Sequence, residues 1–449
     1  MARAGYYVFK IKIKKMKKIL IFVTIILLLF TTCKKKEPIP NSDIVTVDQE
    51  ARDALYGVMN EWYLWYDVMP RVTPENYADP YELLDAMRYK TYDRWSFVED
   101  YDAFNAYYAG SFVGHGYRIG LDETGKARIV FIYKNAPLYS EGVRRGWIVK
   151  KINGYDIATI LRNGDGAAYS TAIGASVAGI TNTFIFVKPD GAEITMSSTK
   201  ATFNVNSVLL YDTIHLSAGK VAGHLVFESF IDPSIDELST AFAFFKQNNV
   251  TDLILDLRYN SGGLLDVAQE LASYIAGSSK VGTTFAKMLY NNKKQASNTI
   301  IAFKATDYPL GLTRLAVITS RSTASASEVV INGLRPHLQV VCIGDTTDGK
   351  PTGMNIWNYD NTFVFAPVTF KNVNSANQGD FFGGLLPGKL VSDDITHDFD
   401  NRNELCLKEA IKYLETGSVS TKGQSIFKKS MQISERPEWQ NNLFVGTFK

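Results

Sequence analysis

A turn rich in small hydroxyl side chains lies between an apolar strand-like run and an apolar helix-like run in RLAVITSRSTASASEVVINGLRP (314–336). Such residues are common in loops because their hydroxyl groups cap helices and close turns. A serine at a strand-to-helix turn is also a position at which hydrolases keep a nucleophile. The pattern predicts a buried strand over 315–319 and a short helix over 328–334. Ser325 would lie beside the N-terminal N–H groups of that helix, which stabilise negative charge, so it is a candidate nucleophile.

A serine nucleophile needs a base, and no histidine follows at a recognisable place in this part of the chain. The next strand instead leads to a lysine in GDTTDGK (344–350), and Lys350 lies 350 − 325 = 25 residues after Ser325. This separation spans one helix and one strand, which allows the lysine to fold back onto the serine. A lysine acts as a base only when neutral, so burial would have to lower its pKa of ~10.4 by several units.

A pair of glycines follows another apolar strand-like run, in LRYNSGGLL (257–265). The N–H groups of Gly262 and Gly263 could face a shared cleft without side chains in the way, and a tight turn that needs positive φ is the alternative. The serine, lysine and glycine turns all follow predicted parallel strands, so they are expected at one edge of a sheet. Of the neighbouring residues, Glu328 is expected to complement the helix dipole and Ser327 to cap the helix. Asp256 and Arg258 are expected to position the sheet edge.

The elements that must position these turns alternate between strand and helix from about residue 207 onward. The segments VAGHLVFESF (221–230), VTDLILDL (250–257), LAVITS (315–320) and QVVCIG (339–344) are typical of strands, and SIDELSTAFAFFKQNN (234–249) is typical of an amphipathic helix. This alternation predicts right-handed crossovers and a layered α/β domain over 207–418.

The chain is long enough for two or three domains. An aromatic-rich helical pattern over 45–112 indicates core or an interdomain seam, and short strands with Gly punctuation over 113–206 indicate a small β-rich domain. The tail over 419–449 is polar and is left unassigned.

The formal net charge of +2 argues against nucleic-acid binding. Cys342 and Cys406 lie in apolar or helical patterns and are expected in the core, and the five histidines show no metal-ligand spacing. We therefore expect no metal, no cofactor and no nucleic-acid partner.

The N-terminus carries a basic run and then ILIFVTIILLLF (19–30) before Cys33. Twelve residues as a helix reach only roughly 18 Å, which is short of a ~30 Å bilayer core. Residues 1–33 are therefore interpreted as an export signal, similar to those of bacterial lipoproteins with Cys33 as the lipidated residue, followed by a linker over 34–44. An uncleaved anchor is the alternative, and Met16 could be the true start. The expected location is the bacterial cell envelope, with the membrane face and the oligomeric state undetermined.

Three motifs, LILDLRYNSGG, ITSRSTASASE and GDTTDGKPTG, resemble in order and spacing those of the C-terminal processing (tail-specific) serine peptidases. The resemblance covers about 113–417. It implies a Ser/Lys dyad of Ser325 and Lys350 on a crotonase-like (Clp-protease-like) α/β spiral. It also implies an oxyanion hole made by the N–H of Ala326 and a glycine N–H, with Gly262 expected ahead of Gly263.

The resemblance extends to an inserted PDZ domain, whose carboxylate-binding loop would be Gly114, His115, Gly116 and Tyr117. Two positions depart from the family pattern: Trp147 stands where Asp is usual, and Met354 stands where Gln usually orients the lysine. Asp345, Thr346, Thr352 or a water could replace that glutamine.

The sequence therefore predicts an exported serine endopeptidase that acts on protein or peptide substrates through an acyl-enzyme. Two alternatives remain open. One is a catalytically inactive PDZ-containing lipoprotein that binds peptides, and the other is a serine hydrolase of non-peptide esters.

Overall fold

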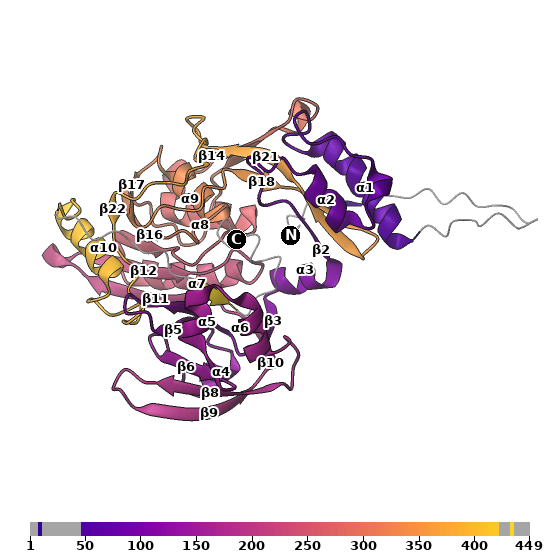
Figure 1. Ribbon diagram of the computed structural model, residues 1–449. Helices are drawn as coiled ribbons and strands as arrows, with labels where there is room; N and C mark the ends of the chain where they lie inside the picture. Colours follow the sequence, from indigo (N-terminus) through magenta and orange to yellow (C-terminus); the bar gives the residue numbers. More distant parts are fainter. Residues whose placement is uncertain (1–7, 11–45, 422–431, 435–449) are drawn as a thin grey trace, which may run out of the picture.

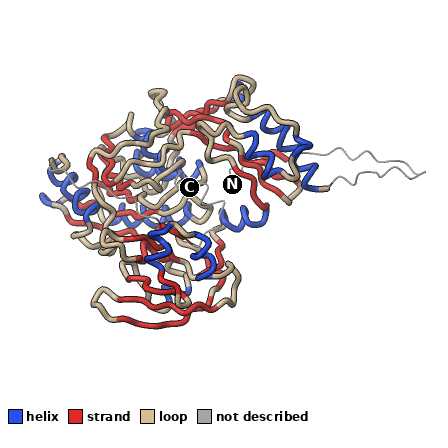
Figure 2. The backbone as a smooth tube through the Cα atoms, viewed as in Figure 1, coloured by secondary structure: helices blue, strands red, loops and turns tan. Residues whose placement is uncertain are grey.

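The computed structural model describes residues 8–10, 46–421 and 432–434 (Figures 1 and 2). Cys33, the apolar run 19–30, the linker 34–44 and most of the tail 419–449 lie outside the described residues. Within the described ranges, no helix combines the length and the apolar character needed to cross a bilayer. The protein is a multidomain α/β structure.

The largest sheet is mainly parallel and carries the candidate turns. Its order is β11-β12-β13-β16-β17-β22; β11 is antiparallel to β12, and the other pairs are parallel. The bounds of these strands are β11 Val208–His215, β12 Val221–Phe227, β13 Asp252–Asp256, β16 Arg314–Thr319, β17 Gln339–Gly344 and β22 Lys389–Leu390. The parallel pairing expected from the alternation of strands and helices is confirmed.

Helices cover both faces of this sheet, which explains why the middle residues of its central strands β13 and β16 are apolar. Side chains of α7 (Ser234–Gln247), α8 (Leu265–Ala276) and α9 (Ala326–Leu334) pack on one face, and α10 (Leu405–Thr416) packs on the other. Alternate residues of β13 show the division: Leu253 and Leu255 join the first cluster and Ile254 the second.

The N-terminal helical region packs on a hairpin from the far end of the chain. Thr46 caps α1 (Val47–Trp62) with a capping box to Gln49, and the buried face of α1 shares a core with α2 (Pro80–Met87), β19 (Ile356–Tyr359) and β20 (Phe363–Ala366). These strands form the sheet β1-β19-β20-β2, with β1 at Val8–Lys10 and β2 at Phe97–Asp100. α3 (Tyr101–Tyr108) then leads toward the strand-rich unit. Many aromatic residues of this region therefore belong to a packed core, one of the two possibilities expected from the sequence.

The segment from 111 to 204 is a strand-rich unit with its own apolar cluster. One sheet has the order β23-β4-β5-β6-β8-β9, β7 pairs with β6, and β10 pairs separately with β3. The bounds are β3 Ser111–Gly114, β4 Tyr117–Leu121, β5 Ala127–Ile132, α4 Pro137–Ser140, β6 Ile148–Ile152, β7 Tyr155–Asp156, α5 Ile157–Asn163, α6 Gly166–Ile173, β8 Thr181–Val187, β9 Glu193–Thr199, β10 Ala201–Asn204 and β23 Gln432–Ser434. β23 comes from the tail that the sequence left unassigned.

A further four-stranded sheet lies against α9. Its order is β15-β14-β21-β18, with bounds β15 Thr299–Ala302, β14 Thr284–Tyr290, β21 Val368–Val373 and β18 Thr352–Met354. β18 begins two residues after Lys350, so this sheet helps to place the lysine.

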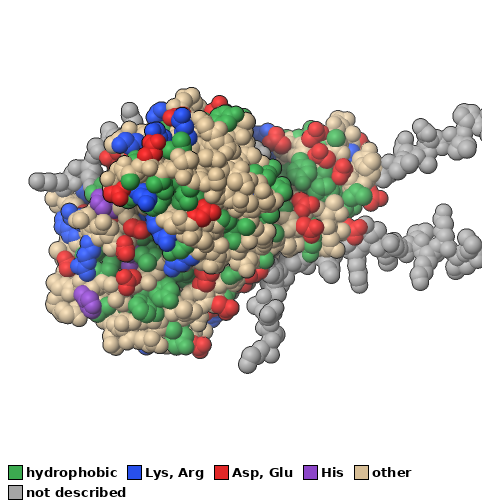
Figure 3. Space-filling model, turned by 90° about the horizontal axis from the view of Figure 1, so that it is seen from below, with side chains coloured by type: hydrophobic (Ala, Val, Ile, Leu, Met, Phe, Trp, Pro, Cys, Tyr) green, Lys and Arg blue, Asp and Glu red, His purple; other side chains and the backbone are tan. Residues whose placement is uncertain are grey.

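The described residues include two cysteines, and the charged side chains are spread over the surface that Figure 3 shows. Cys342 and Cys406 are free and buried, so their assignment to the core is confirmed. On the face seen from below, acidic and basic side chains are interspersed with apolar ones, without a broad basic patch (Figure 3).

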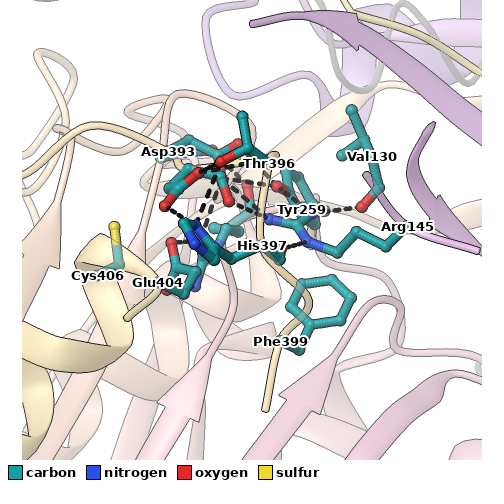
Figure 4. A network of polar contacts seen from close by, with 12 residues as sticks. Val130, Arg145, Tyr259, Asp393, Thr396, His397, Phe399, Glu404 and Cys406 are labelled. Atoms are coloured by element: carbon teal, nitrogen blue, oxygen red, sulfur yellow. Dashed lines mark hydrogen bonds and ion pairs between the residues drawn. The ribbon is translucent and has the colours of Figure 1, made fainter. Parts of the chain in front are cut away.

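A buried ionic cluster joins the strand-rich unit to the large sheet (Figure 4). Arg258 pairs with Asp256 at 2.7 Å and with Glu404 at 2.8 Å, and Arg145 of the strand-rich unit donates to the Tyr259 hydroxyl at 2.9 Å. Burial raises the pKa of a carboxyl group, but at Glu404 the charge and hydrogen bonds of Arg258, the charge of Arg145 and the Leu407 N–H together outweigh burial and hold its pKa below the usual range. Asp256 and Arg258 thus act structurally, as expected.

Candidate active site

A cavity of about 160 Å³ opens where the turns that follow β13 and β16 meet. All five residues singled out as catalytic or oxyanion-hole candidates line it together: Ser325, Lys350, Ala326, Gly262 and Gly263. The other lining residues are Phe97, Phe104, Tyr107, Tyr108, Ser261, Leu264, Leu265, Val329, Gly353, Met354, Ile356, Phe370 and Asn372.

Ser325 adopts a backbone conformation that is rare for a residue with a side chain. Its φ is +54° and its ψ is −116°, and it occupies the N-cap position of α9, which begins at Ala326. Strained dihedrals of this kind persist where the surrounding structure enforces them, and they cluster at functional sites. The helix begins two residues earlier than predicted. Ser327 was expected to be the cap, and that expectation was wrong, because it lies inside the helix.

The other hydroxyl groups of the turn bind the chain that follows β13. Thr323 donates to the Leu257 carbonyl at 2.8 Å, Ser327 donates to the Asn260 carbonyl at 3.0 Å, and Ser320 donates to the Arg258 carbonyl. These bonds fasten the turn to its neighbour. Of the five hydroxyl side chains between β16 and Glu328, only Ser325 lines the cavity.

The glycine turn approaches the serine so closely that it leaves no room for side chains. Gly262 has φ +102°, and a Cβ there would lie 2.8 Å from both the Ala326 nitrogen and the Ser325 Cβ. Gly263 has φ +136°, and a Cβ there would lie 2.1 Å from the Phe230 carbonyl oxygen. The Gly262 N–H is already engaged, because it donates to Asn260 Oδ1 at 2.8 Å. Both positions therefore require glycine. Among the described residues, the Gly262 N–H has a hydrogen-bond acceptor, whereas no acceptor is present for the Gly263 N–H.

Lys350 is 4% exposed, and its surroundings disfavour the charged amine. Burial lowers its pKa from 10.5 to about 8, against the opposing influence of the Asp348, Asp93 and Glu328 carboxylates. Lys350 Nζ lies 6.0 Å from the centre of the Trp95 ring. No hydrogen bond between Lys350 Nζ and Ser325 Oγ is present in the described part of the chain. Catalytic hydrogen bonds are often loose in ligand-free structures and tighten when substrate binds.

A buried carboxylate ties the two catalytic candidates together. Glu328 accepts hydrogen bonds from the backbone N–H of Ser325 (3.0 Å), Gly349 (2.8 Å) and Lys350 (2.8 Å), and from the Thr347 hydroxyl. Burial, reinforced by the charge of Asp348, raises the pKa of Glu328 to about 7. From the sequence, Glu328 was expected only to complement the helix dipole. Its position three residues after Ser325 was the sequence feature that could have indicated its hydrogen bond to the Ser325 N–H.

The N-terminal region supplies part of the surroundings of the lysine. Arg94 forms an ion pair of 3.1 Å with Asp348, and the indole N–H of Trp95 donates to the other oxygen of that carboxylate at 3.2 Å. Asp348 lies two residues before Lys350. No sequence signal connected residues 94 and 95 to a loop more than 250 positions away.

Met354 occupies the position at which the family pattern has the glutamine that orients the lysine. Its apolar side chain lines the cavity. Thr352 is buried, and its hydroxyl has no hydrogen-bond partner among the described residues. The carboxamide oxygen of Asn372 likewise lacks a partner there, and this residue lines the cavity. The Asn372 backbone N–H also donates to the carbonyl of Pro351 at 2.8 Å, directly beside Lys350. The sequence analysis missed Asn372.

The candidate carboxylate-binding loop lies apart from this cavity, between β3 and β4. Gly116 has φ +78°, while His115 is fully buried with its ring bonded to Asn182 at 2.8 Å and Ser198 at 3.1 Å. Burial lowers the pKa of His115 to about 4, so the ring is neutral near pH 7. The His115 side chain therefore supports the unit from within. Within the described ranges, no cluster of three or more His, Cys, Asp or Glu side chains could hold a metal ion.

Comparison with known proteins agrees with this architecture. Residues 221–387 match the model of peptidase family S41, and residues 50–97 match that of the peptidase S41 N-terminal domain. The first of these ranges includes Gly262, Ser325 and Lys350, so the likeness covers the turns that line the cavity. Over these two ranges the chain is similar to peptidase family S41.

Similar proteins come from several bacteria. The carboxy-terminal processing protease CtpB of Bacillus subtilis (strain 168) is 26% identical over 247 residues, which are 54% of this chain and 47% of that protein. A probable CtpA-like serine protease of Staphylococcus aureus (strain bovine RF122 / ET3-1) is 22% identical over 80% of this chain and 69% of its own length. A solved structure of a putative S41 protease from Bacteroides fragilis NCTC 9343 has a TM-score of 0.65 at 23% identity, and covers 84% of this chain and 99% of its own.

Proposed function

We propose that this chain is an endopeptidase of the C-terminal processing type, with Ser325 as nucleophile and Lys350 as general base. One observation carries the proposal: a strained serine and a buried lysine of lowered pKa line one cavity. A neutral amine near pH 8 can accept the serine proton, whereas an ammonium group cannot.

The reaction would follow the usual course of acyl transfer. Lys350 Nζ takes the proton of Ser325 Oγ as that oxygen attacks the scissile carbonyl carbon. The resulting ammonium protonates the departing amine, and the C–N bond breaks to leave an acyl-enzyme. Lys350 then deprotonates a water that attacks the ester, which releases the second product and restores the serine.

Two backbone N–H groups would stabilise the oxyanion. The Ala326 N–H lies at the start of α9, where helix donors and the dipole favour negative charge. Because the Gly262 N–H is engaged by Asn260, Gly263 is the better candidate for the second donor. The oxyanion hole that we propose therefore uses Ala326 and Gly263, in place of the Gly262 that the sequence favoured.

The residue that orients the lysine amine is proposed to be Asn372. Its unpartnered carboxamide oxygen lines the same cavity as Lys350 and can accept a hydrogen bond from an amine. The thioether of Met354, at the position of the expected glutamine, cannot do so usefully.

The cavity walls favour an apolar substrate side chain. Aromatic residues from β2 and α3, namely Phe97, Phe104 and Tyr107, line the cavity together with aliphatic ones such as Val329. We further propose that the strand-rich unit is a PDZ-like peptide-binding domain, and that the protein is exported and anchored through Cys33.

Active-site labelling tests the proposal. A fluorophosphonate probe should modify the wild-type protein at Ser325, as located by mass spectrometry of the labelled peptide. Ser325→Ala should remain unlabelled, and Ser322→Ala, on the same turn but outside the cavity, should label normally. Absence of labelling in the folded wild type would favour the non-catalytic alternative. Labelling with cleavage of ester substrates but of no peptide would favour the esterase alternative.

A further inference from the structure

The tail of the chain adds a strand to the edge of the strand-rich unit. β23 is antiparallel to β4, with Gln432 opposite Gly120, Ile433 opposite Ile119 and Ser434 opposite Arg118. The other side of β4 is occupied by β5, so β23 forms the end of this sheet. In Figure 1 it is the short yellow strand among the purple elements of that unit.

The edge of β4 is suited to taking up an extended chain. An unpaired edge strand presents a row of backbone donors and acceptors, and an added strand satisfies them. Gly120 permits close approach, because a Cβ there would lie 2.9 Å from Cγ of Gln432. The tail sequence SMQIS (430–434) alternates apolar and polar residues, a sequence pattern typical of strands.

The same edge is connected to the nucleophile turn. Arg118, the residue of β4 that lies opposite Ser434, donates a hydrogen bond of 3.0 Å to the Ser322 hydroxyl. Ser322 lies three residues before Ser325. A strand that pairs with β4 at Arg118 is therefore linked, through the Arg118 side chain, to the turn that carries Ser325.

We infer that the segment around β23 is an intramolecular ligand of the β4 edge, and that it competes there with extended peptides, including substrates. Recognition would rest on backbone pairing, because β23 contacts β4 as an antiparallel strand. The inference rests on the proposed function only in that the competing peptides are substrates. Binding itself needs no catalysis.

Tethering makes the competition strong. A segment tethered to the chain that carries its binding site has an effective concentration of ~1 mM, so for a segment of ~10–100 μM intrinsic affinity it weakens a competing peptide by about 10- to 100-fold. A free peptide should therefore bind poorly to the full chain and well to a chain without its tail.

The experiment measures peptide binding in a Ser325→Ala background, so that cleavage plays no part. The probe is fluorescein-labelled KKSMQISERPE, the sequence of residues 428–438. We expect a chain truncated after Thr421 to bind it about 10- to 100-fold more tightly than the full chain does. A scrambled peptide should bind neither.

A second variant removes the dependence on truncation. Ile433→Pro in the full chain should weaken the pairing, because proline is poorly tolerated within a strand ladder, and should raise the affinity for the free peptide. Ile433→Val, which keeps a strand-forming residue, should bind the peptide as weakly as the unaltered chain. Hydrogen exchange at Arg118–Gly120 should become faster in the proline variant and stay slow in the valine variant.

The inference is overturned if the peptide binds equally to the full chain, to the chain truncated after Thr421 and to the Ile433→Pro variant. It is also overturned if the peptide binds to none of these chains while they remain folded. Either result leaves the proposed peptidase activity untouched, since labelling of Ser325 tests that separately.

Discussion

The turn that carries Ser325 and the loop that carries Lys350 are stabilised in different ways. The serine turn is fastened by its own hydroxyl groups to the adjacent chain at 257–260. The lysine loop is held by the Glu328 carboxylate and by Arg94 and Trp95 of the N-terminal region.

The serine turn is therefore stabilised mainly by a neighbouring segment, whereas the lysine loop is also stabilised by contacts from a distant part of the chain. The serine turn depends on two neighbouring segments that follow adjacent parallel strands. The pKa of the lysine depends on burial and on contacts from segments that lie far apart in the chain. We therefore expect changes far from the cavity to affect the lysine more than the serine.

The largest effect should come from Lys350 itself. Lys350→Ala removes the base, and kcat/KM for peptide cleavage should fall by about 10⁴-fold, since general-base catalysis contributes up to that factor. The variant should remain folded, because it removes a buried charged group. Lys371→Ala, on β21 and outside the cavity lining, is the matched control and should cleave normally. Cleavage by Lys350→Ala at the control rate would exclude the lysine as base.

Replacing Glu328 should lower both the stability of the protein and its activity. Glu328→Ala leaves several buried donors without an acceptor, so the free energy of unfolding should fall by about 3 kcal/mol or more. Denaturant unfolding measures this, and activity in the folded variant should fall because both backbones lose their common anchor. An unchanged unfolding midpoint would show that the carboxylate is not an anchor.

The pH dependence of stability sharpens this test. The pKa of Glu328 is raised from 4.5 to about 7 in the folded state, so the folded protein holds this proton more tightly than the unfolded chain does. The stabilising contribution is complete below pH 4.5 and is lost as the pH rises toward 7. Wild type should lose stability relative to Glu328→Gln across that window. A constant difference between the two would contradict the raised pKa.

Asn372 should have a smaller effect, confined to catalysis. Asn372→Ala removes the proposed acceptor for the lysine amine, and kcat should fall by about tenfold, the value of one hydrogen bond. Asn372→Ala combined with Met354→Gln should recover activity, because glutamine again offers a carboxamide oxygen. A loss that this second substitution does not relieve, with the pH profile unchanged, would argue for a purely structural role.

The smallest effect is expected at Arg94. Its positive charge contributes to lowering the pKa of Lys350, so Arg94→Ala should raise that pKa and shift the pH profile upward. Cleavage should fall severalfold below pH 8 and converge with wild type at higher pH. Arg71→Ala, an exposed arginine of the same region, should leave the profile in place. If the pH profile does not shift in Arg94→Ala, the N-terminal region does not influence the pKa of Lys350, and the contrast between the two loops fails.

The sequence predicts the parallel strands and the three turns because each turn is a short motif with its own local chemistry. Ser325, Lys350, Gly262 and Gly263 were found in this way, and the structure brings them to one cavity. Arg94, Trp95 and Asn372 were not found, because their roles depend on contacts between segments far apart in the chain. The pairing of β23 with β4 was also missed, since three residues in a polar tail carry too little periodic signal.

The most direct test of the account measures how the rate of acylation of Ser325 depends on pH. With a fluorophosphonate in excess, the rate constant should rise about tenfold per pH unit and level off near pH 8, as Lys350 loses its proton. Lys350→Ala should react slowly at every pH. A rate that stays constant from pH 6 to 10, or equal rates for wild type and Lys350→Ala, would contradict the account.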